Sequence, residues 1–302
     1  MTISGNVPGH LLAMAKTGFL TTALKPVPDW MPIAQMVDIN LKNQTLVDIG
    51  GAPMPVRNRG KVVAQDFIEK LLAVEPLTWD IVVGISGNAV DDDQTGTLLS
   101  RVRGAGANFQ RHIAQQAFQA LNDGDSATAG VVGAGYDGKA LFANDHVDKG
   151  AAYTTQQDNL DSLTLTIPNF ETVLTKANLA RDDQGEFTDY NYDLLVVDPT
   201  NRRAAYNITD NKEDSSTTDR AANPYAGKLR TIVSPKLDAG AWILVASGET
   251  VKPILIVMRK QPSLEDAWKD PLQTDGGMYY FKFSGRYNFY VGDWRTAWMG
   301  HS

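Results

Sequence analysis

The chain has 302 residues, and its 28 Lys and Arg against 35 Asp and Glu give a formal net charge of −7. Hydrophobic residues at 43% and charged residues at 21% are typical of a folded protein and exclude a disordered, collagen-like or coiled-coil chain. The lack of cysteine excludes disulfides, cysteine-ligated metals and thiol nucleophiles. The acidic balance argues against a protein that functions mainly by binding DNA or an anionic membrane.

The first forty residues carry several prolines around one short helical pattern at residues 10–20. We interpret this segment as an extended arm with little core of its own. No basic segment precedes its apolar patch at residues 11–15, so a secretory signal is not expected. No stretch of the chain approaches the ~20 apolar residues of a membrane-spanning helix. We therefore expect synthesis in the cytoplasm and no membrane partner.

The next region, residues 61–90, is rich in apolar residues and follows a segment of glycines and prolines at 50–55. Its residues 77–83 have the β-branched and aromatic character of a strand that ends at Gly84. We interpret the region as a long segment that contains strands and extends away from the body of the protein. It is expected to be more exposed than is usual for so apolar a segment.

The clearest regular pattern predicts one long amphipathic helix at residues 97–121, about 37 Å in length at 1.5 Å per residue. Its apolar residues recur at steps of three or four: Leu98, Val102, Ala105, Phe109, Ile113, Ala117 and Leu121. Gly104 and Gly106 each weaken the helix by ~1 kcal/mol relative to alanine. They are expected where another backbone packs close to the helix.

A second unit, in which strands and a helix alternate, is predicted after a loop at residues 124–153. The expected strands lie at residues 163–167, 193–197, 231–233, 242–245 and 253–258, and the expected helix lies at 168–180. The tail, residues 278–298, is dense in aromatic side chains. It predicts a strand hairpin that is interrupted by Gly285 and Gly292.

The glycine spacing Gly133-x-Gly135-x-x-Gly138 matches the dinucleotide-binding fingerprint. That fingerprint requires a strong strand before it and a helix that opens at its end. The flanking residues predict neither element, so a loop is the favoured interpretation. A nucleotide-dependent enzyme that uses this loop stays the least favoured functional alternative.

Other catalytic or metal-binding patterns are equally incomplete. Asp91-x-Asp93-x-Thr95 resembles a phosphotransferase nucleophile motif, but three residues separate it from the preceding strand, so a solvated helix start explains it better. No two of the four histidines have the spacing of a zinc site. His146 is expected to make a capping interaction in a polar loop. The sequence thus predicts no enzyme and no catalytic, cofactor-binding or metal-binding residue.

An ordered series of segments resembles the Mu-like bacteriophage major head subunits. The pattern Gly138-x-x-Leu141-Phe142-x-x-x-His146 is similar to a stretch of that family. Later segments agree with the family in wording and order, namely residues 223–227, 232–237, 241–244, 251–254 and 259–260, and so does the aromatic ending through Tyr287 and Trp294. The resemblance covers residues 91 to the C-terminus well and the first ninety residues only in layout.

The resemblance implies the Hong Kong 97 phage capsid fold, of the α+β class. The parts of that fold would be an N-terminal arm at 1–40, an extended loop at 41–90, a peripheral domain with the spine helix at 91–159, an axial domain at 160–255, and a return to the peripheral domain at 256–302.

The implied function is that of a major capsid protein of a tailed bacteriophage or prophage. It would self-assemble in the host bacterial cytoplasm into the hexamers and pentamers of an icosahedral head, and it would reside in the virion. Its implied partners are further copies of itself, portal and scaffolding proteins, a cement protein in some heads, and packaged double-stranded DNA contacted without specificity. An acidic wall suits this last role, because a cationic one would bind the genome tightly.

Such a shell protein needs complementary surfaces more than an active site. The apolar residues Trp79, Ile81 and Val83 of the extended loop are expected to find no cover in their own subunit and to contact a neighbour, at roughly 25 cal/mol per Å² of buried apolar area. Arg101 and Arg103 on the long helix are further candidates for intersubunit contacts. The alternative within the same fold is an encapsulin-type nanocompartment, which would hold cargo enzymes and no genome.

Overall fold

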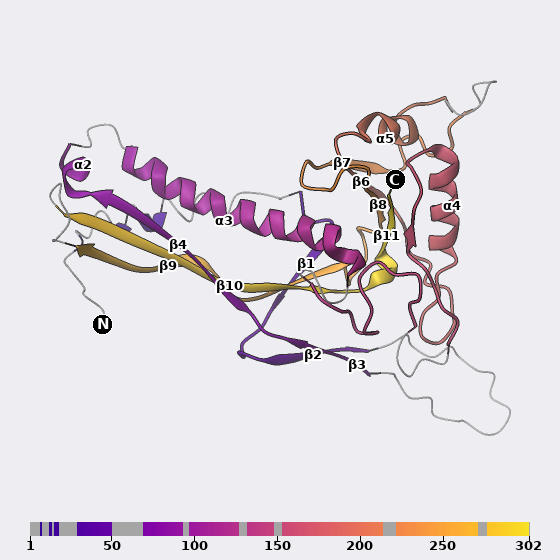
Figure 1. Cartoon of the computed structure of the whole chain (residues 1–302), viewed down its shortest axis with the longest axis horizontal. Coiled ribbons are helices and arrows are strands. Elements are labelled where there is room, and N and C mark those ends of the chain that lie inside the picture. Colours follow the sequence, from indigo (N-terminus) through magenta and orange to yellow (C-terminus); the bar gives the residue numbers. More distant parts are fainter. Residues whose placement is uncertain are drawn as a thin grey trace.

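The computed structural model describes residues 7, 12–13, 15–17, 29–49, 69–92, 97–126, 132–147, 153–213, 222–270 and 277–301. These residues form an elongated body in which a long sheet, accompanied by a long helix, leads into a compact lobe (Figure 1). One continuous hydrophobic core runs through both parts. A second, small core lies under a two-stranded hairpin.

The long sheet has four strands in the order β1-β9-β10-β4. They are β1 (Ala34–Asp38), β4 (Leu77–Ser86), β9 (Ile254–Asp270) and β10 (Met278–Val291). Strand β10 is antiparallel to both β9 and β4, and β1 pairs with β9 in parallel. The expected strand at 77–83 is confirmed, but its place in a segment that extends away from the body is wrong. All residues of β4 pair with β10, so β4 belongs to the long sheet.

Helix α3 (Thr97–Asn122) lies along one face of this sheet and confirms the predicted long helix (Figure 1). Its apolar stripe is the reason for this packing, since Phe109, Ile113 and Leu121 are each buried in the main core. The expectation of a close backbone at Gly104 is wrong, because a Cβ built there would meet nothing within 4 Å. A short helix, α2 (Gly87–Asp91), precedes α3 at the end of β4.

The compact lobe has a five-stranded sheet in the order β5-β11-β8-β6-β7. Its elements are β5 (Leu160–Asp161), α4 (Ile167–Asn178), β6 (Leu194–Val197), α5 (Arg202–Thr209), β7 (Arg230–Val233), β8 (Trp242–Val245) and β11 (Ala297–Gly300). The strands predicted at 193–197, 231–233 and 242–245 are confirmed. All four residues of β6 and of β8 are buried, as expected for central strands that are covered on both faces.

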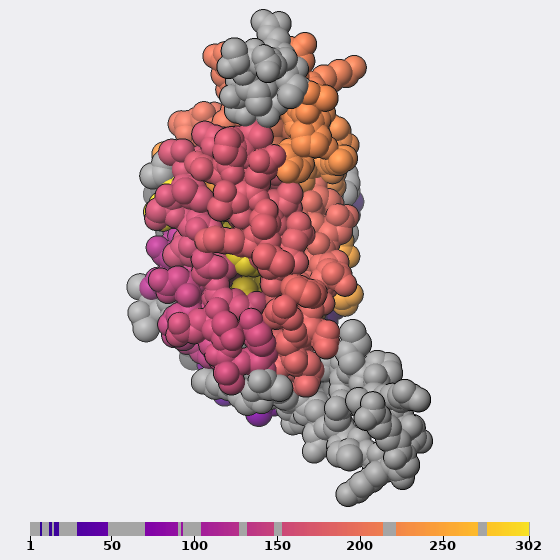
Figure 2. Space-filling model, turned by 90° about the vertical axis from the view of Figure 1, so that its right-hand side faces the viewer, coloured from indigo at the N-terminus to yellow at the C-terminus, as the bar shows by residue number. Residues whose placement is uncertain are grey.

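The strand predicted at 163–167 is wrong, because residues 163–166 form no strand and Ile167 begins helix α4. Thr166 caps that helix by accepting a hydrogen bond from the Asn169 amide at 3.3 Å, and Pro168 occupies the first turn, where no amide partner is needed. Seen from its outer end, the lobe is covered by α4 and the chain that leads to α5, and residues near the C-terminus show only through a small gap (Figure 2).

The aromatic tail does not form the predicted hairpin. Strand β10 continues through Gly285, although its register against β9 is irregular there, and a Cβ at Gly285 would lie 3.1 Å from Cγ of Pro262 on the neighbouring strand. The chain leaves this sheet at Gly292, where glycine is needed because a Cβ would collide with the Lys252 carbonyl oxygen. Strand β11 then joins the compact lobe instead. A 3₁₀ turn, η2 (Trp294–Thr296), connects the two sheets.

The hairpin consists of β2 (Gln44–Ile49) and β3 (Glu69–Val74), which pair only with each other in the described part of the chain. It lies beneath the long sheet in Figure 1. The residues between its strands, 50–68, are outside the described residues. Of the helices in the described ranges, none is both long and apolar enough to cross a membrane.

Candidate functional site

Trp79, Ile81 and Val83 face the main core of their own subunit. They alternate along β4 with exposed residues and pack, partly buried, against that core. The Trp79 ring lies 4.4 Å from the ring of His112 on α3, and its Nε1 donates to the Tyr287 carbonyl oxygen at 3.0 Å. The expectation that these side chains have no cover in their own subunit is therefore wrong, while their contact with a neighbouring subunit stays a prediction. Their alternation lets α3 cover one face of β4.

His112 and Tyr287 form a polar contact inside this interface. The Tyr287 hydroxyl lies within hydrogen-bonding distance of Nδ1 of His112, at 2.8 Å, and the tautomer of the ring decides which of the two groups donates. Burial lowers the pKa of His112 and raises the pKa of Tyr287. Both shifts favour the uncharged forms, so the contact suits a closed junction between α3 and the long sheet.

The opposite face of β4 is polar and carries paired charges. Nζ of Lys282 lies 3.2 Å from Asp80 and 3.1 Å from Glu265. Its hydrogen bonds to Glu265 and Asp80 raise the pKa of Lys282. Such exposed pairs contribute little to stability. Val82 is half-exposed beside them. Arg101 and Arg103 lie in the first turns of α3, but their side chains are outside the described residues, so their intersubunit role stays a prediction.

One pair of exposed apolar side chains lies directly opposite each other on the hairpin. Val47 and Leu71 are directly opposite in the β2–β3 register, and their exposed fractions are 56% and 60%. Thr45 and Ala73, also opposite each other, extend the exposed face. We call Thr45, Val47, Leu71 and Ala73 the hairpin outer face. Exposed apolar patches of this kind are typical of interaction sites.

The other face of the hairpin is buried on the subunit. Leu72 and Val74 form the small core with Ile39 and Val257, and Leu46 packs against it. A two-stranded hairpin is marginally stable alone, so this core is what holds it to the body. Sequence reasoning missed the outer face because residues 71–74 read as one apolar run, and only the strand register separates the two faces.

The loop at residues 132–147 confirms the interpretation of its glycines as turn residues. Within the described residues, no helix opens after Gly138, and the Gly135 amide instead donates to the Lys139 carbonyl oxygen at 2.7 Å. Gly133 and Gly138 have φ angles of 66° and 82°, which favour glycine. The arrangement that a dinucleotide would need is therefore replaced by a tight turn.

His146 is buried and not, as expected, a capping residue in a polar loop. Nδ1 lies 2.6 Å from Asp137 Oδ2, and Nε2 lies 3.0 Å from Asn159 Oδ1. The Asn159 oxygen is fixed as an acceptor, because Nδ2 donates to the carbonyls of Leu141, Trp294 and Ala297. Both ring nitrogens thus face oxygen atoms.

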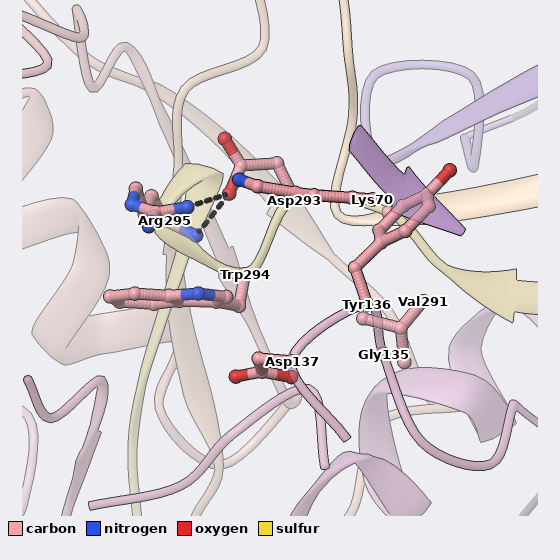
Figure 3. A pocket seen from close by; sticks show the side chains of 9 residues that line it. Lys70, Gly135, Tyr136, Asp137, Val291, Asp293, Trp294 and Arg295 are labelled. Atoms are coloured by element: carbon pink, nitrogen blue, oxygen red, sulfur yellow. Dashed lines mark hydrogen bonds and ion pairs between the residues drawn. The ribbon is translucent and has the colours of Figure 1, made fainter. Parts of the chain in front are cut away.

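The ring of His146 also stacks on Trp294, with centroids 4.1 Å apart and an angle of 2° between the planes. The cluster therefore ties the loop, the residue before β5 and the η2 turn together at the junction of the long sheet and the sheet of the compact lobe. Beside it a small hollow is lined by Lys70, Tyr136, Asp137 and residues 291–295 (Figure 3).

Within the hollow, Asp293 accepts from Arg295 at 3.2 Å, and the Arg295 guanidinium lies over the Trp294 ring (Figure 3). The described residues contain no group of three acidic or histidine side chains that could hold a metal ion. Asp137, His146, Asp293 and Arg295 of this junction engage protein partners, whereas the buried Trp294 Nε1 makes no hydrogen bond to the described residues. We assign the junction a structural role.

Comparisons with known proteins identify the class. A model of the phage capsid protein family matches residues 71–299, and no curated protein matches. The chain belongs to the phage capsid protein family. Its function is that of a major capsid protein.

Solved structures share the fold at low sequence identity. The procapsid protein of bacteriophage JBD30 is 15% identical with a TM-score of 0.56, over 97% of this chain and 74% of that chain. The protein of the mature capsid of bacteriophage PhiM1 is 8% identical with a TM-score of 0.55, over 100% of this chain and 91% of that chain. The protein of a virus-like particle from Pyrococcus furiosus is 11% identical with a TM-score of 0.53, over 96% of this chain and 98% of that chain. The fold is the Hong Kong 97 capsid fold, as the resemblance implied.

Proposed function

We propose that this chain self-assembles into the hexamers and pentamers of an icosahedral phage head that encloses double-stranded DNA. The observation that carries the proposal is the family match over residues 71–299, together with a fold shared with phage capsids. A closed shell needs many contacts that are weak singly and strong together. The subunit would therefore act by its surfaces and perform no catalysis.

The hairpin outer face is the contact that we propose for these assemblies. Its partner is a second copy of the chain, because a shell of one protein must supply both sides of each contact. Covering Val47 and Leu71 on a neighbour would contribute roughly 25 cal/mol per Å² of apolar area removed from water. Trp79, Ile81 and Val83 would then act indirectly, by holding α3 on the sheet inside each subunit.

The domain assignment follows the same interpretation. We propose an arm at 1–40, an extended loop that includes the β2–β3 hairpin, a peripheral domain built on α3 and the long sheet, and an axial domain that corresponds to the compact lobe. Portal and scaffolding proteins, a cement protein in some heads, and non-specifically contacted DNA are the further partners that we propose. The net charge of −7 supports a wall that does not bind the genome tightly.

We further propose membership of the Mu-like group and assembly in the host bacterial cytoplasm. The support for the first is the pattern from Gly138 to His146. The buried contacts of His146 with Asp137 and Asn159 give its last position a physical reason to be histidine. An asparagine there would not reach both partners and stack on Trp294 as well.

Electron microscopy of purified particles tests the proposal. We expect closed shells from the purified chain and nuclease-protected double-stranded DNA in particles that are isolated from lysed host cells. Closed shells that hold protein cargo and no nucleic acid would favour the encapsulin-type alternative. Discrete small oligomers whose melting temperature rises with added nucleotide would contradict both and favour the enzyme.

A further inference from the structure

The corner between the hairpin and the long sheet is held by two side chains of β10. The chain passes from β3 to β4 through Glu75 and Pro76. The Glu75 amide donates to the Tyr290 hydroxyl oxygen at 2.7 Å. The Glu75 carbonyl oxygen accepts from the Tyr290 hydroxyl and from Asn288 Nδ2, both at 3.0 Å. Both backbone polar groups of the corner residue are thus bound by β10.

Asn288 and Tyr290 also hold each other. Asn288 Nδ2 donates to the Tyr290 hydroxyl oxygen at 3.1 Å. The hydroxyl therefore donates once and accepts twice, which matches its full hydrogen-bonding capacity. Pro76 has no amide to offer and restricts Glu75 to extended backbone, so the corner is stiff on its own side as well.

The ring of Tyr290 adds an apolar contact between the hairpin and the long sheet. It packs against the small core of Ile39, Leu72, Val74 and Val257. Its backbone belongs to β10, where it pairs with Leu255 of β9. Tyr290 thus connects the long sheet with the hairpin. Its backbone belongs to β10, its ring touches the small core between the two, and its hydroxyl binds Glu75 at the corner.

The contacts of the Tyr290 hydroxyl with Glu75 are exposed to solvent. Their loss can therefore change the angle at the corner without a large change in folding stability. If the hydroxyl is removed, water can satisfy the Glu75 amide and carbonyl at the surface, so folding stability changes little. The angle at the corner, however, loses two of the three hydrogen bonds that fix it. Since β2 and β3 pair only with each other among the described residues, that angle and the small core together set the direction of the hairpin.

We infer that Tyr290 and Asn288 are positioning residues that set the direction in which the hairpin leaves the subunit. They thereby decide where the hairpin outer face meets a second copy and how uniformly subunits curve into a shell. This inference rests on the proposed self-assembly for its consequence in the shell. The clamp itself is a property of the single subunit.

The test uses the full chain with Tyr290→Phe, which keeps the ring, and Asn288→Ala. Tyr280→Phe is the matched control, since Tyr280 lies on the same strand and face but stacks on Trp268, with centroids 5.2 Å apart. We expect melting temperatures like that of the control. Amide exchange at residues 71–74 of the unassembled subunit should rise several-fold in both clamp variants. Their shells should vary in diameter or fall several-fold in yield.

Shells of wild-type diameter and yield from both clamp variants would overturn the inference. If the wild-type chain forms no shell, the proposed function fails, and amide exchange alone decides the clamp. Exchange at 71–74 that is no faster in Tyr290→Phe than in Tyr280→Phe would then overturn it.

Discussion

The compact lobe and the hairpin use similar apolar residues in opposite ways. In the lobe, every side chain of β6 and β8 is buried between layers that belong to the same chain. In the hairpin, Leu72 is buried on the body while its neighbour Leu71 is 60% exposed. The β6 and β8 strands of the lobe are buried within one subunit, whereas the hairpin has one buried face and one exposed face among the described residues. We propose that the lobe supplies rigidity to the capsid subunit and that the exposed face of the hairpin supplies contact with a second copy.

The sharpest way to break this comparison is a cavity in the lobe. Trp242 is fully buried, and its Nε1 donates to the Leu163 carbonyl oxygen at 2.8 Å. Trp242→Ala should lower the free energy of unfolding by about 3–5 kcal/mol, because it leaves a large cavity and an unsatisfied carbonyl. Urea unfolding of the unassembled subunit measures the loss. A change below ~1 kcal/mol would show that the lobe is not packed as described.

A smaller effect is expected at the junction of α3 and the long sheet. Trp79 is half-buried and touches His112 and Tyr287. Trp79→Ala should cost about 2 kcal/mol of folding stability, less than a fully buried tryptophan. Assembly should fall only in proportion to the folded fraction, as measured by sedimentation at matched folded concentration. If Trp79→Ala loses assembly while its free energy of unfolding is unchanged, the result would contradict this account and support a direct intersubunit contact of Trp79.

Sequence reasoning succeeded where the pattern was local. The spacing of apolar residues at every third or fourth position located α3, and short runs of apolar residues located β6 and β8. It failed where a residue's role depends on a distant partner. The sequence predicts that Gly285 interrupts a hairpin, but the strand continues through it, and a glycine is favoured there because Pro262 of the adjacent strand packs close. Trp79 reads as uncovered, but its carbonyl partner, Tyr287, is 208 positions away.

The candidate site shows the same limit. The outer and inner faces of the hairpin differ by one residue in register, and the register is set by pairing with β2 and by the small core. The motif that ends at His146 was visible, but Asn159 and Trp294, which give that histidine its place, lie in other parts of the chain.

A pH effect smaller than the Trp79→Ala loss sharpens the account of the junction. Burial lowers the pKa of His112 below its usual value of 6.5, so the unfolded chain takes up the proton first as the pH falls. Stability is full above about pH 6.5 and is lost as the pH falls toward the lower pKa of the folded form. The urea midpoint should fall less between pH 7.5 and 5.5 in His112→Gln than in wild type. Equal falls would contradict this assignment.

The smallest effect on folding is expected on the hairpin outer face. Leu71→Ser should change the free energy of unfolding by no more than about 0.5 kcal/mol, because the side chain is exposed in the subunit. Its shell yield should nevertheless fall at least tenfold in sedimentation. Leu179→Ser is the matched control, since Leu179 is 58% exposed at the end of α4, and it should assemble normally. Equal yields from the two variants would refute the special role of the hairpin.

A cryo-electron reconstruction of the assembled particle tests the central idea most directly, because it shows what touches Val47 and Leu71 in the finished structure. The account predicts a closed shell in which a second copy covers both side chains. A closed shell in which the two side chains still point into solvent would contradict it.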